Sequence, residues 1–263
     1  MRRQLVTQKL WKSLQRLLPL PPRRRGRGPR LDDRAALNGM LFVLTTGIPW
    51  EDLPQGLGFG SGMTCWRRLR GWQLQGLWGP LHLALLTQLR QCDQIDWSRA
   101  NIDGASVASP RGGQETGPNP TDRGKLGSKR HTVVDRRGLP LALCISSANR
   151  HDSMVFEALI DAIPGLPSQP RKRPDRLHAD KGYDYRRCCE YLRRRGIQVR
   201  IARRGVESRE KLERYRWVIG RTHARLAWFG KLRIRFERRL DTHYALLRLA
   251  CSLTCLRFIE KFC

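Results

Sequence analysis

The sequence predicts an α/β fold, in which a mixed sheet with helices on both faces follows an all-helical N-terminal region. Two observations lead to this prediction. Apolar residues recur at helical spacing over roughly the first 92 residues, and short β-rich runs take over from about residue 95. In the second half the expected order is three strands, then helix, strand, helix, strand and helix, an alternation typical of a mixed sheet between layers of helices.

The N-terminal region, residues 1–92, is expected to be helical throughout. Residues 5–18 form the first helix, which ends at the prolines that follow. Residues 32–46 form the second, with Asp32 or Asp33 as its cap. Two more helices are expected at 63–70 and 77–89. A short basic helix after a glycine-containing turn indicates a helix-turn-helix-like DNA-binding unit, although helical bundles with basic surfaces share this pattern.

A basic arm, residues 22–30, joins the first two helices. Its glycines and prolines preclude regular structure, and it carries Arg23, Arg24 and Arg25. It is either a solvated linker or an arm that lies along DNA phosphates, and the charge of the whole chain favours the second interpretation.

The second region, residues 93–263, is expected to hold the sheet. A strand-like stretch between Ile95 and Val107 is expected to end at Asp103-Gly104, and residues 111–125 are predicted to be a loop. A hairpin turn is expected at 136–138, and Asp152 is the expected cap of the next helix. The remaining elements expected here are strands at 129–135, 139–146, 176–180 and 197–202 and helices at 153–163, 185–195, 210–229 and 245–262.

Charge is the outstanding feature of the composition. The chain has 51 Lys and Arg against 23 Asp and Glu, a formal net charge of +28. With 40% hydrophobic residues it can still form a packed core. A folding chain with this excess indicates a polyanionic partner, and double-stranded DNA is the expected one.

Other classes of protein fit less well. The sequence has no lipid anchor, signal peptide or membrane span, so we expect a cytoplasmic, nucleoid-associated protein without a membrane partner. The eight cysteines form no CxxC pair with zinc-finger spacing, and we expect them to be small buried residues in a reducing compartment.

Two aspartates are candidates for metal-dependent chemistry on phosphodiesters. Asp103 and Asp180 are each expected to end a strand of the central sheet, and the ends of neighbouring strands meet at the ligand site of an open sheet. Carboxylates suit magnesium, which binds hard oxygen ligands and keeps several waters. An isolated Asp-Gly is more often a turn residue, but here two such acids occur in a strongly basic chain.

Several segments resemble bacterial insertion-sequence transposases of the DDE class, in the IS-five group. These pieces occur in the family's order from about residue 10 onward: LDDRAALNGMLFVLTTGIPWEDLP, GSGMTCWRRLRGWQ, WSRANIDGASV, RGGQETGPNPTDRGKLGSKRHTVVDRRGLPLAL, HADKGYDYRRC, IARRGVES and LRIRFERRLDTH.

The resemblance implies a ribonuclease-H-like catalytic domain behind a helical DNA-binding region. It also implies Mg²⁺ or Mn²⁺, a homo-oligomer, and cleavage at the terminal inverted repeats followed by strand transfer to target DNA. Asp103 matches the family's first catalytic aspartate and Asp180, in Ala-Asp-Lys-Gly-Tyr-Asp, matches the second. Both would be metal ligands.

The third acid of the family has no counterpart. The family carries a glutamate in an Arg-Trp-Val-Val-Glu-Arg-Thr stretch, where this chain has Gly220. Two aromatic residues of the family just beyond it are His223 and Arg225 here. Glycine costs a helix roughly 1 kcal/mol relative to alanine, so helix stability gives no reason for it. We therefore expect cleavage to be impaired.

Four other acids are considered as substitutes, and none is expected to serve. Glu213 lies seven residues before Gly220, about 10 Å away along a helix. Glu237 belongs to a stretch where the family also has glutamate. Asp152 is expected to be a helix cap and Asp135 a turn residue.

Other residues near the aspartates have two interpretations each. Tyr183 and Tyr185 could stack on an extruded base but are expected to pack in the core, and His178 is either a partner of Asp180 or a core residue. The basic residues expected to contact DNA, rather than form a solvated surface, are Arg23, Arg24, Arg25, Arg67, Arg68, Lys125, Lys129, Arg130, Arg203 and Arg204.

The sequence therefore predicts an insertion-sequence transposase of reduced cleavage competence. One alternative is a decayed copy that only binds the inverted repeats. Another, from a different class, is a structural nucleic-acid-binding protein whose aspartates are turn residues.

Overall fold

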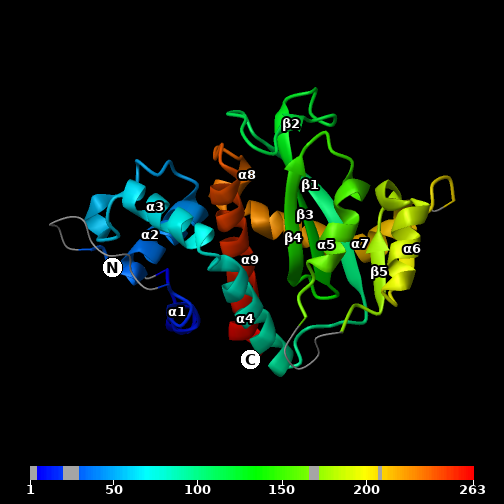
Figure 1. Cartoon of the computed structure of the whole chain (residues 1–263), viewed down its shortest axis with the longest axis horizontal. Helices are drawn as coiled ribbons and strands as arrows, with labels where there is room; N and C mark the ends of the chain where they lie inside the picture. The colour runs from blue at the N-terminus through cyan, green and yellow to red at the C-terminus, as the bar shows by residue number, and fades with distance from the viewer. Residues whose placement is uncertain (1–4, 20–29, 166–171, 207–208) are drawn as a thin grey trace.

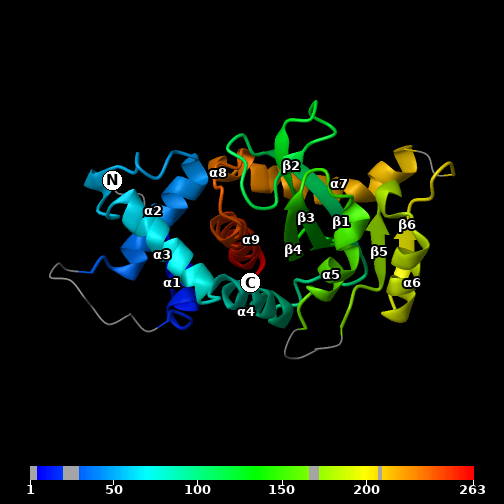
Figure 2. The ribbon, with the colours of Figure 1, turned by 45° about the horizontal axis from the view of Figure 1, so that its top comes forward.

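The computed structural model describes residues 5–19, 30–165, 172–206 and 209–263. The arm carrying Arg23, Arg24 and Arg25 therefore lies outside the described residues. A layer of N-terminal helices lies at one end of the molecule and the sheet lies at the other, with a long C-terminal helix between them (Figures 1 and 2).

The N-terminal layer contains α1 (Gln8–Gln15), α2 (Asp33–Thr46), α3 (Gly62–Leu74) and α4 (Trp78–Gln91), with a short 3₁₀ turn η1 (Gln55–Leu57). Side chains cap the starts of the first three: the Asp32 carboxylate, for example, accepts the Ala35 N–H at 2.9 Å. The predicted helices are confirmed, and the third is longer than expected because Ser61 caps it upstream of residue 63.

The sheet contains β1 (Ala100–Ala108), β2 (Gly117–Pro118), β3 (Leu126–Asp135), β4 (Pro140–Ser147), β5 (Arg176–Ala179) and β6 (Gln198–Ile201). Its long strands lie in the order β4-β3-β1-β5-β6. The pairs β4–β3 and β3–β1 are antiparallel, and β1–β5 and β5–β6 are parallel. This is the ribonuclease-H-like mixed sheet that the resemblance implied. The short β2 lies in the segment predicted to be a loop, where it pairs with the start of β3.

Helices cover both faces of the sheet. On one face lie η2 (Asp152–Val155), α5 (Phe156–Asp161), η3 (Lys181–Tyr183) and α6 (Arg186–Arg194), and on the other lies α7 (Arg209–Ala227) (Figure 2). The cap predicted at Asp152 is wrong: the His151 side chain accepts the Ser153 N–H instead, so Asp152 begins the turn and its carboxylate is free for other partners.

The last helices connect the sheet to the N-terminal layer. The short α8 (Gly230–Arg233), which the sequence did not predict, packs against the end of α2, and α9 (Leu240–Phe262) packs against α3 and α4. Backbones touch at the first of these contacts: a Cβ on Gly47 would lie 2.7 Å from the carbonyl carbon of Gly230. One continuous apolar core thus runs from α1 to the sheet. The predicted division between residues 92 and 93 stays a prediction.

Two expectations about composition can be compared with the structure. All eight cysteines are free thiols, and four of them are buried as expected: Cys65, Cys188, Cys251 and Cys255. The expectation is wrong for the other four, because Cys92, Cys144 and Cys189 are half-buried and Cys263 is exposed. Within the described ranges, no helix is long and apolar enough to cross a membrane.

Candidate active site

Asp103 and Asp180 lie at the same level of the sheet, on the two central parallel strands. Asn101 of β1 is the register partner of His178 of β5, and each aspartate comes two residues after its strand's partner. Asp180 follows the last residue of β5, as predicted. Asp103, however, does not end β1, which continues to Ala108 because β3 pairs with it along its whole length. The pairing with β5 is what ends just before Asp103, so the strands part there.

A guanidinium group joins the two carboxylates. Arg216 Nη2, from α7, lies 3.3 Å from Asp103 Oδ2 and 3.6 Å from Asp180 Oδ2. Because one nitrogen atom reaches both oxygens, the two acids converge on a space that a single cation can fill. The sequence predicted the convergence but not the arginine.

The two aspartates are held differently. Asp103 is largely buried, and burial raises its pKa to about 6 against the opposing effect of Arg216, while the neighbouring charge of Asp180 raises it further. Its Oδ1 accepts the Gly104 N–H at 2.9 Å. Asp180 caps η3, where its Oδ1 accepts the Gly182 N–H at 2.9 Å. Each carboxylate therefore has one oxygen fixed by the backbone and the other turned toward Arg216.

Gly220 follows Arg216 by one turn of α7 and has open space around it. It is exposed, and a Cβ built on it would meet no atom within 4 Å. Residues four apart share a helix face, and helical side chains point back toward the N-terminus, so a side chain at 220 would extend toward Arg216 and the two acids. Position 220, where the resemblance places the third acid, therefore has room for a longer side chain.

The donor set suits one hard cation better than two. Magnesium can be held by one or two carboxylates with water completing its shell, which Asp103 and Asp180 can provide. Among the residues that the structure describes, no group of three or more His, Cys, Asp and Glu side chains could hold a metal. A second ion would therefore lack a protein ligand on the Gly220 side.

The other acids do not replace the missing one. Asp152 lies beside Gly104 of β1, and its carboxylate accepts a hydrogen bond from Lys129 Nζ at 2.7 Å. Asp135 is buried and accepts backbone N–H groups of the turn, including Leu139 at 2.8 Å, as predicted for a turn residue. Glu237 is buried beside Lys231 Nζ at 3.5 Å. Glu213 belongs to the part of α7 whose side chains are outside the described structure.

The histidine and the two tyrosines near the site differ in burial. Tyr183 is fully buried, with its ring centroid 5.6 Å from that of Phe156, so packing is confirmed for it. Tyr185 is partly exposed, and the Arg204 guanidinium lies 4.9 Å from the centre of its ring. His178 is partly buried in β5, where burial lowers its pKa to about 4.

The seven predicted DNA-contacting residues that the structure describes fall into two groups. Arg67, Lys125, Arg203 and Arg204 are exposed, as phosphate contacts need to be. The other three have protein partners: Arg68 pairs with Asp33, Lys129 pairs with Asp152, and Arg130 is 4% exposed and donates to the Leu232 carbonyl at 3.3 Å. Arg130 is therefore a core residue, and DNA contact at that position is not supported by the geometry.

Sequence reasoning missed Arg216 and a second group of cations, which lies between α7 and α9. Arg216 was part of the stretch that carries Gly220, and its spacing of four residues from Gly220 was the available signal. The second group includes Arg221 and Arg225, also spaced by one helical turn, and is described below. In each case, spacing places residues on one face but does not say what lies opposite.

Two families match most of the chain. Residues 95–255 match the family described as "Transposase DDE domain", and residues 6–82 match "Putative transposase of IS4/5 family". A relative from Burkholderia cepacia, "Putative transposase for insertion sequence element IS402", is 51% identical over 57% of this chain and 72% of its own length. A second from the same organism, "Insertion element IS402 uncharacterized 16.2 kDa protein", is 48% identical over 46% of this chain and 84% of its own.

Solved structures give only a distant likeness. The "Crystal structure of the Mos1 Strand Transfer Complex" aligns with 92% of this chain and 82% of its own, with a TM-score of 0.34 and 11% identity. The "Crystal structure of the Mos1 mariner paired end complex with Mn" aligns with 96% of this chain and 89% of its own, with a TM-score of 0.27 and 12% identity.

Proposed function

Since the chain belongs to the insertion-sequence transposases with a DDE domain, we propose that it binds the terminal inverted repeats of its element and is impaired in cutting them. The observation that carries the proposal is the convergence of Asp103 and Asp180 on one cation, Arg216, which comes one helical turn before the open position of Gly220. A DDE domain depends on divalent metal in general, and for this chain we propose Mg²⁺ or Mn²⁺.

Asp103 and Asp180 are the proposed metal ligands. A bound divalent ion would stabilise negative charge on the phosphate and activate an attacking oxygen. The two aspartates would orient the scissile phosphate between their strands, and Arg216 would have to withdraw from their oxygens first. With no acid at 220, the site would offer the metal two carboxylates instead of three. Because misplacement by about 1 Å can cost 10²-fold in rate, we expect cleavage and strand transfer to be slow.

The proposed partner is double-stranded DNA, both the inverted repeats and the target. The net charge of +28 and the exposed Arg67, Lys125, Arg203 and Arg204 support contact with phosphates. Binding that neutralises many phosphates should weaken steeply as salt rises. Action on the two ends of one element also favours a homo-oligomer associated with the bacterial nucleoid, which we include in the proposal.

A second candidate function is favoured by Gly220 itself. A copy that has lost its third acid could still bind the repeats and interfere with active copies through mixed oligomers. A structural nucleic-acid-binding protein, the remaining alternative, would need no converging acids. Metal-dependent nicking would distinguish an active transposase from the inactive copy and from the structural protein. Binding confined to inverted repeats would distinguish either kind of transposase from the structural protein.

The test compares cleavage of a labelled duplex ending in the inverted repeat by the unmodified chain and by Gly220→Glu, with Gly220→Gln as control. Both substitutions fill the same open space, but only glutamate adds a carboxylate. We expect the unmodified chain and the glutamine variant to bind the duplex and scarcely nick it. Gly220→Glu should nick it at least about 10²-fold faster, in a reaction that needs Mg²⁺ or Mn²⁺.

Three outcomes would contradict the proposal. Robust metal-dependent cleavage by the unmodified chain would show that the third acid is dispensable. Equal rates for the glutamate and glutamine variants would show that position 220 does not face the metal. Equal affinity for the repeat and for unrelated duplex would favour a structural nucleic-acid-binding protein.

A further inference from the structure

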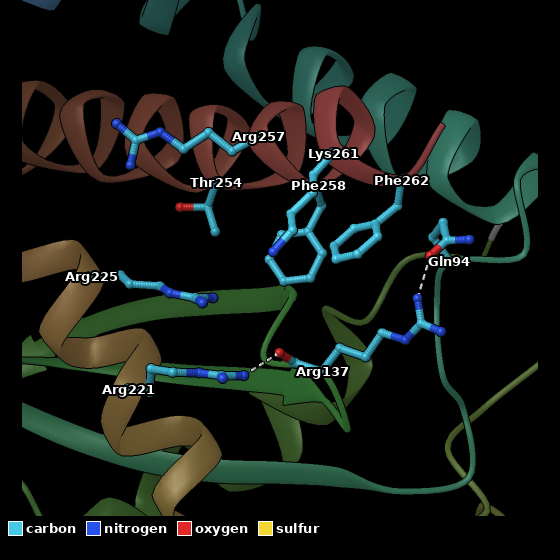
Figure 3. Close-up of a pocket in the computed structure, with 9 residues that line it drawn as sticks. All are labelled: Gln94, Arg137, Arg221, Arg225, Thr254, Arg257, Phe258, Lys261 and Phe262. Atoms are coloured by element: carbon cyan, nitrogen blue, oxygen red, sulfur yellow. Dashed lines mark hydrogen bonds between the residues drawn. The ribbon is translucent and has the colours of Figure 1, made fainter.

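A cavity of about 560 Å³ lies between α7 and the C-terminal half of α9. Arg137, in the turn between β3 and β4, and Gln94, in the segment after α4, also line it, and the cavity is partly open to solvent (Figure 3). The volume is in the range of small-molecule sites in proteins, which run from about 300 to 1,000 Å³. The cavity is lined by nine residues: Gln94, Arg137, Arg221, Arg225, Thr254, Arg257, Phe258, Lys261 and Phe262.

The lining carries unbalanced positive charge. Five of its nine residues are arginine or lysine, and none is aspartate or glutamate. Two of the cations also connect the walls of the cavity: Arg221 donates through Nη2 to the Arg137 carbonyl at 2.8 Å, which leaves its Nε without a partner among the described residues, and the Arg137 side chain donates to Gln94. The lining therefore attracts an anion that the described residues do not supply.

Arg225 has a buried hydrogen-bond donor that no acceptor in the described part of the chain satisfies. Its Nη1 atom is buried without a hydrogen-bond partner, as is Nε of Arg221. Burial lowers the pKa of Arg225, and the neighbouring charges of Arg221 and Arg257 lower it further. A buried guanidinium donor left unpaired is costly, and an oxyanion between these side chains would remove that cost.

Aromatic rings form the opposite side of the cavity. Phe258 and Phe262 are one turn apart on α9, with ring centroids 5.8 Å apart, and Phe262 is 48% exposed. The Arg225 guanidinium lies 5.7 Å from the centre of the Phe258 ring. Figure 3 shows the arginines of α7 and the two rings of α9 directed into the same space. Arginine with exposed aromatic faces is the combination that holds phosphate and base together.

The cavity is separate from the candidate active site. Arg225 comes nine positions after Arg216, about two and a half helical turns, so the two side chains leave α7 on opposite sides. None of the residues that the sequence predicted to contact DNA lines the cavity. Whatever binds there does so without touching Asp103 or Asp180.

We propose that this cavity binds one nucleotide unit, with its phosphate between Arg221, Arg225 and Arg257 and its base against Phe262. The unit is either a nucleotide of an unpaired DNA strand or a free nucleotide, two sources of the same chemistry. The inference does not rest on the proposed function, because the charge, volume and rings are the same whether or not the chain cuts DNA.

The test measures binding of a fluorescein-labelled five-nucleotide oligothymidylate to the full chain in EDTA at physiological salt, with ADP as a competitor. EDTA removes divalent metal, so the aspartates do not contribute. The pocket variant is Arg221→Gln/Arg225→Gln. The control is Arg193→Gln/Arg194→Gln, which removes the same charge from exposed positions on α6. We expect at least tenfold weaker binding in the pocket variant and less than a twofold change in the control.

Two further variants keep the test decisive if the double variant is unstable. Arg257→Gln and Phe262→Ala alter exposed side chains on α9, so they should fold normally. Each should weaken the oligonucleotide several-fold, and Phe262→Ala should leave competition by inorganic pyrophosphate unchanged because that ligand has no base. Displacement by ADP at comparable concentration would identify the source as a free nucleotide. Failure of ADP to compete would identify it as a DNA strand.

The proposal is overturned if the pocket and control variants lose affinity by the same factor, since binding would then reflect only overall charge. Unchanged binding in both Arg257→Gln and Phe262→Ala would overturn it as well, as would a failure of both the oligonucleotide and ADP to bind.

Discussion

The two sides of α7 present arginines to opposite surroundings. On the side facing the sheet, one guanidinium, Arg216, lies between two carboxylates. On the other side, Arg221 and Arg225 face a cavity whose lining contains no acid. The same residue type is a counter-ion in one place and an unpaired cation in the other.

This difference shows what each side lacks. The sheet side has more negative than positive side-chain charge at its centre, so it can take a cation once Arg216 withdraws. The cavity side has only positive charge and can take an anion. Helix α7 therefore lies between two sites that attract ions of opposite charge. The number of arginines in the sequence does not distinguish these two sites.

Acid should unfold the chain without first altering the charge of the cavity. Burial lowers the pKa of His82 to about 4 and that of His243 to about 3. Such histidines bind a proton more weakly in the folded state than in the unfolded state. Their contribution to the free energy of unfolding is therefore complete above pH 6.5 and is lost as the pH falls toward 4. At about 1.4 kcal/mol per pH unit, each would contribute on the order of 3 kcal/mol over that range.

Urea denaturation midpoints measured from pH 7 to pH 4 check this prediction. His243→Gln should flatten the decline, whereas His151→Gln, at an exposed position, should not. Arginines stay charged throughout, so any loss of nucleotide in this range should follow unfolding. Stability that stays constant down to pH 4 would be inconsistent with buried neutral histidines.

Shortening Ile219 should loosen both sides of α7 at once. Its side chain is 1% exposed and packs with Val134 and Val218 in a small cluster beneath the helix. Ile219→Ala should cost about 2–5 kcal/mol and Ile219→Val about 0.5–1.5 kcal/mol, because the larger truncation leaves the larger cavity. Chemical denaturation of the two variants measures this. Equal stabilities would mean that α7 is held by something other than this contact.

Removing Arg216 should improve metal binding at the aspartates. Arg216→Gln takes away the cation that competes for their oxygens, and we expect Mn²⁺ affinity to rise about tenfold, equivalent to about 1.4 kcal/mol. Arg221→Gln is the matched control on the same helix and should leave Mn²⁺ affinity unchanged. Isothermal titration with Mn²⁺ distinguishes them. If both variants changed the affinity alike, the two sides of α7 would not be separate.

A substitution on the solvent-exposed side of α7 should have the smallest effect on stability and on binding. Trp228 is 83% exposed and lies just beyond the last turn of the helix. Trp228→Ala should change the free energy of unfolding by less than about 0.5 kcal/mol, the usual range for surface substitutions. Thermal unfolding, together with Mn²⁺ and nucleotide titrations, checks it. A change in either affinity would extend one of the two sites onto this edge.

Local patterns allowed much of the fold to be predicted. The period of the apolar residues placed most helices and strands. The cap of α2 was predicted to be Asp32 or Asp33, because a capping side chain acts within its own turn, and the structure shows that it is Asp32. The short β2 and α8 were missed because their few residues gain stability from the elements they contact rather than from their own sequence. The extent of β1 was missed because its pairing with β3 decides it.

The candidate site was predictable only in part. Asp103 and Asp180 were expected at the ends of neighbouring strands, which meet at one edge of a sheet, so their convergence could be foreseen although β1 continues beyond Asp103. Arg216 could not be placed between them, because its position depends on how α7 crosses the sheet. The cavity was missed for the same reason, since its cations come from a turn and two helices. Arg130, by contrast, was assigned to the surface by its charge but lies in the core.

The most direct measurement counts Mn²⁺ ions bound to the purified chain, using the electron paramagnetic resonance signal of free Mn²⁺, for the unmodified protein and for Asp103→Asn, Asp180→Asn and Gly220→Glu. The convergence of the two acids predicts one weakly bound ion, lost in either asparagine variant, and a second ion in Gly220→Glu. Mn²⁺ binding that persists unchanged when Asp103 or Asp180 is replaced would contradict a shared cation site and the function built on it.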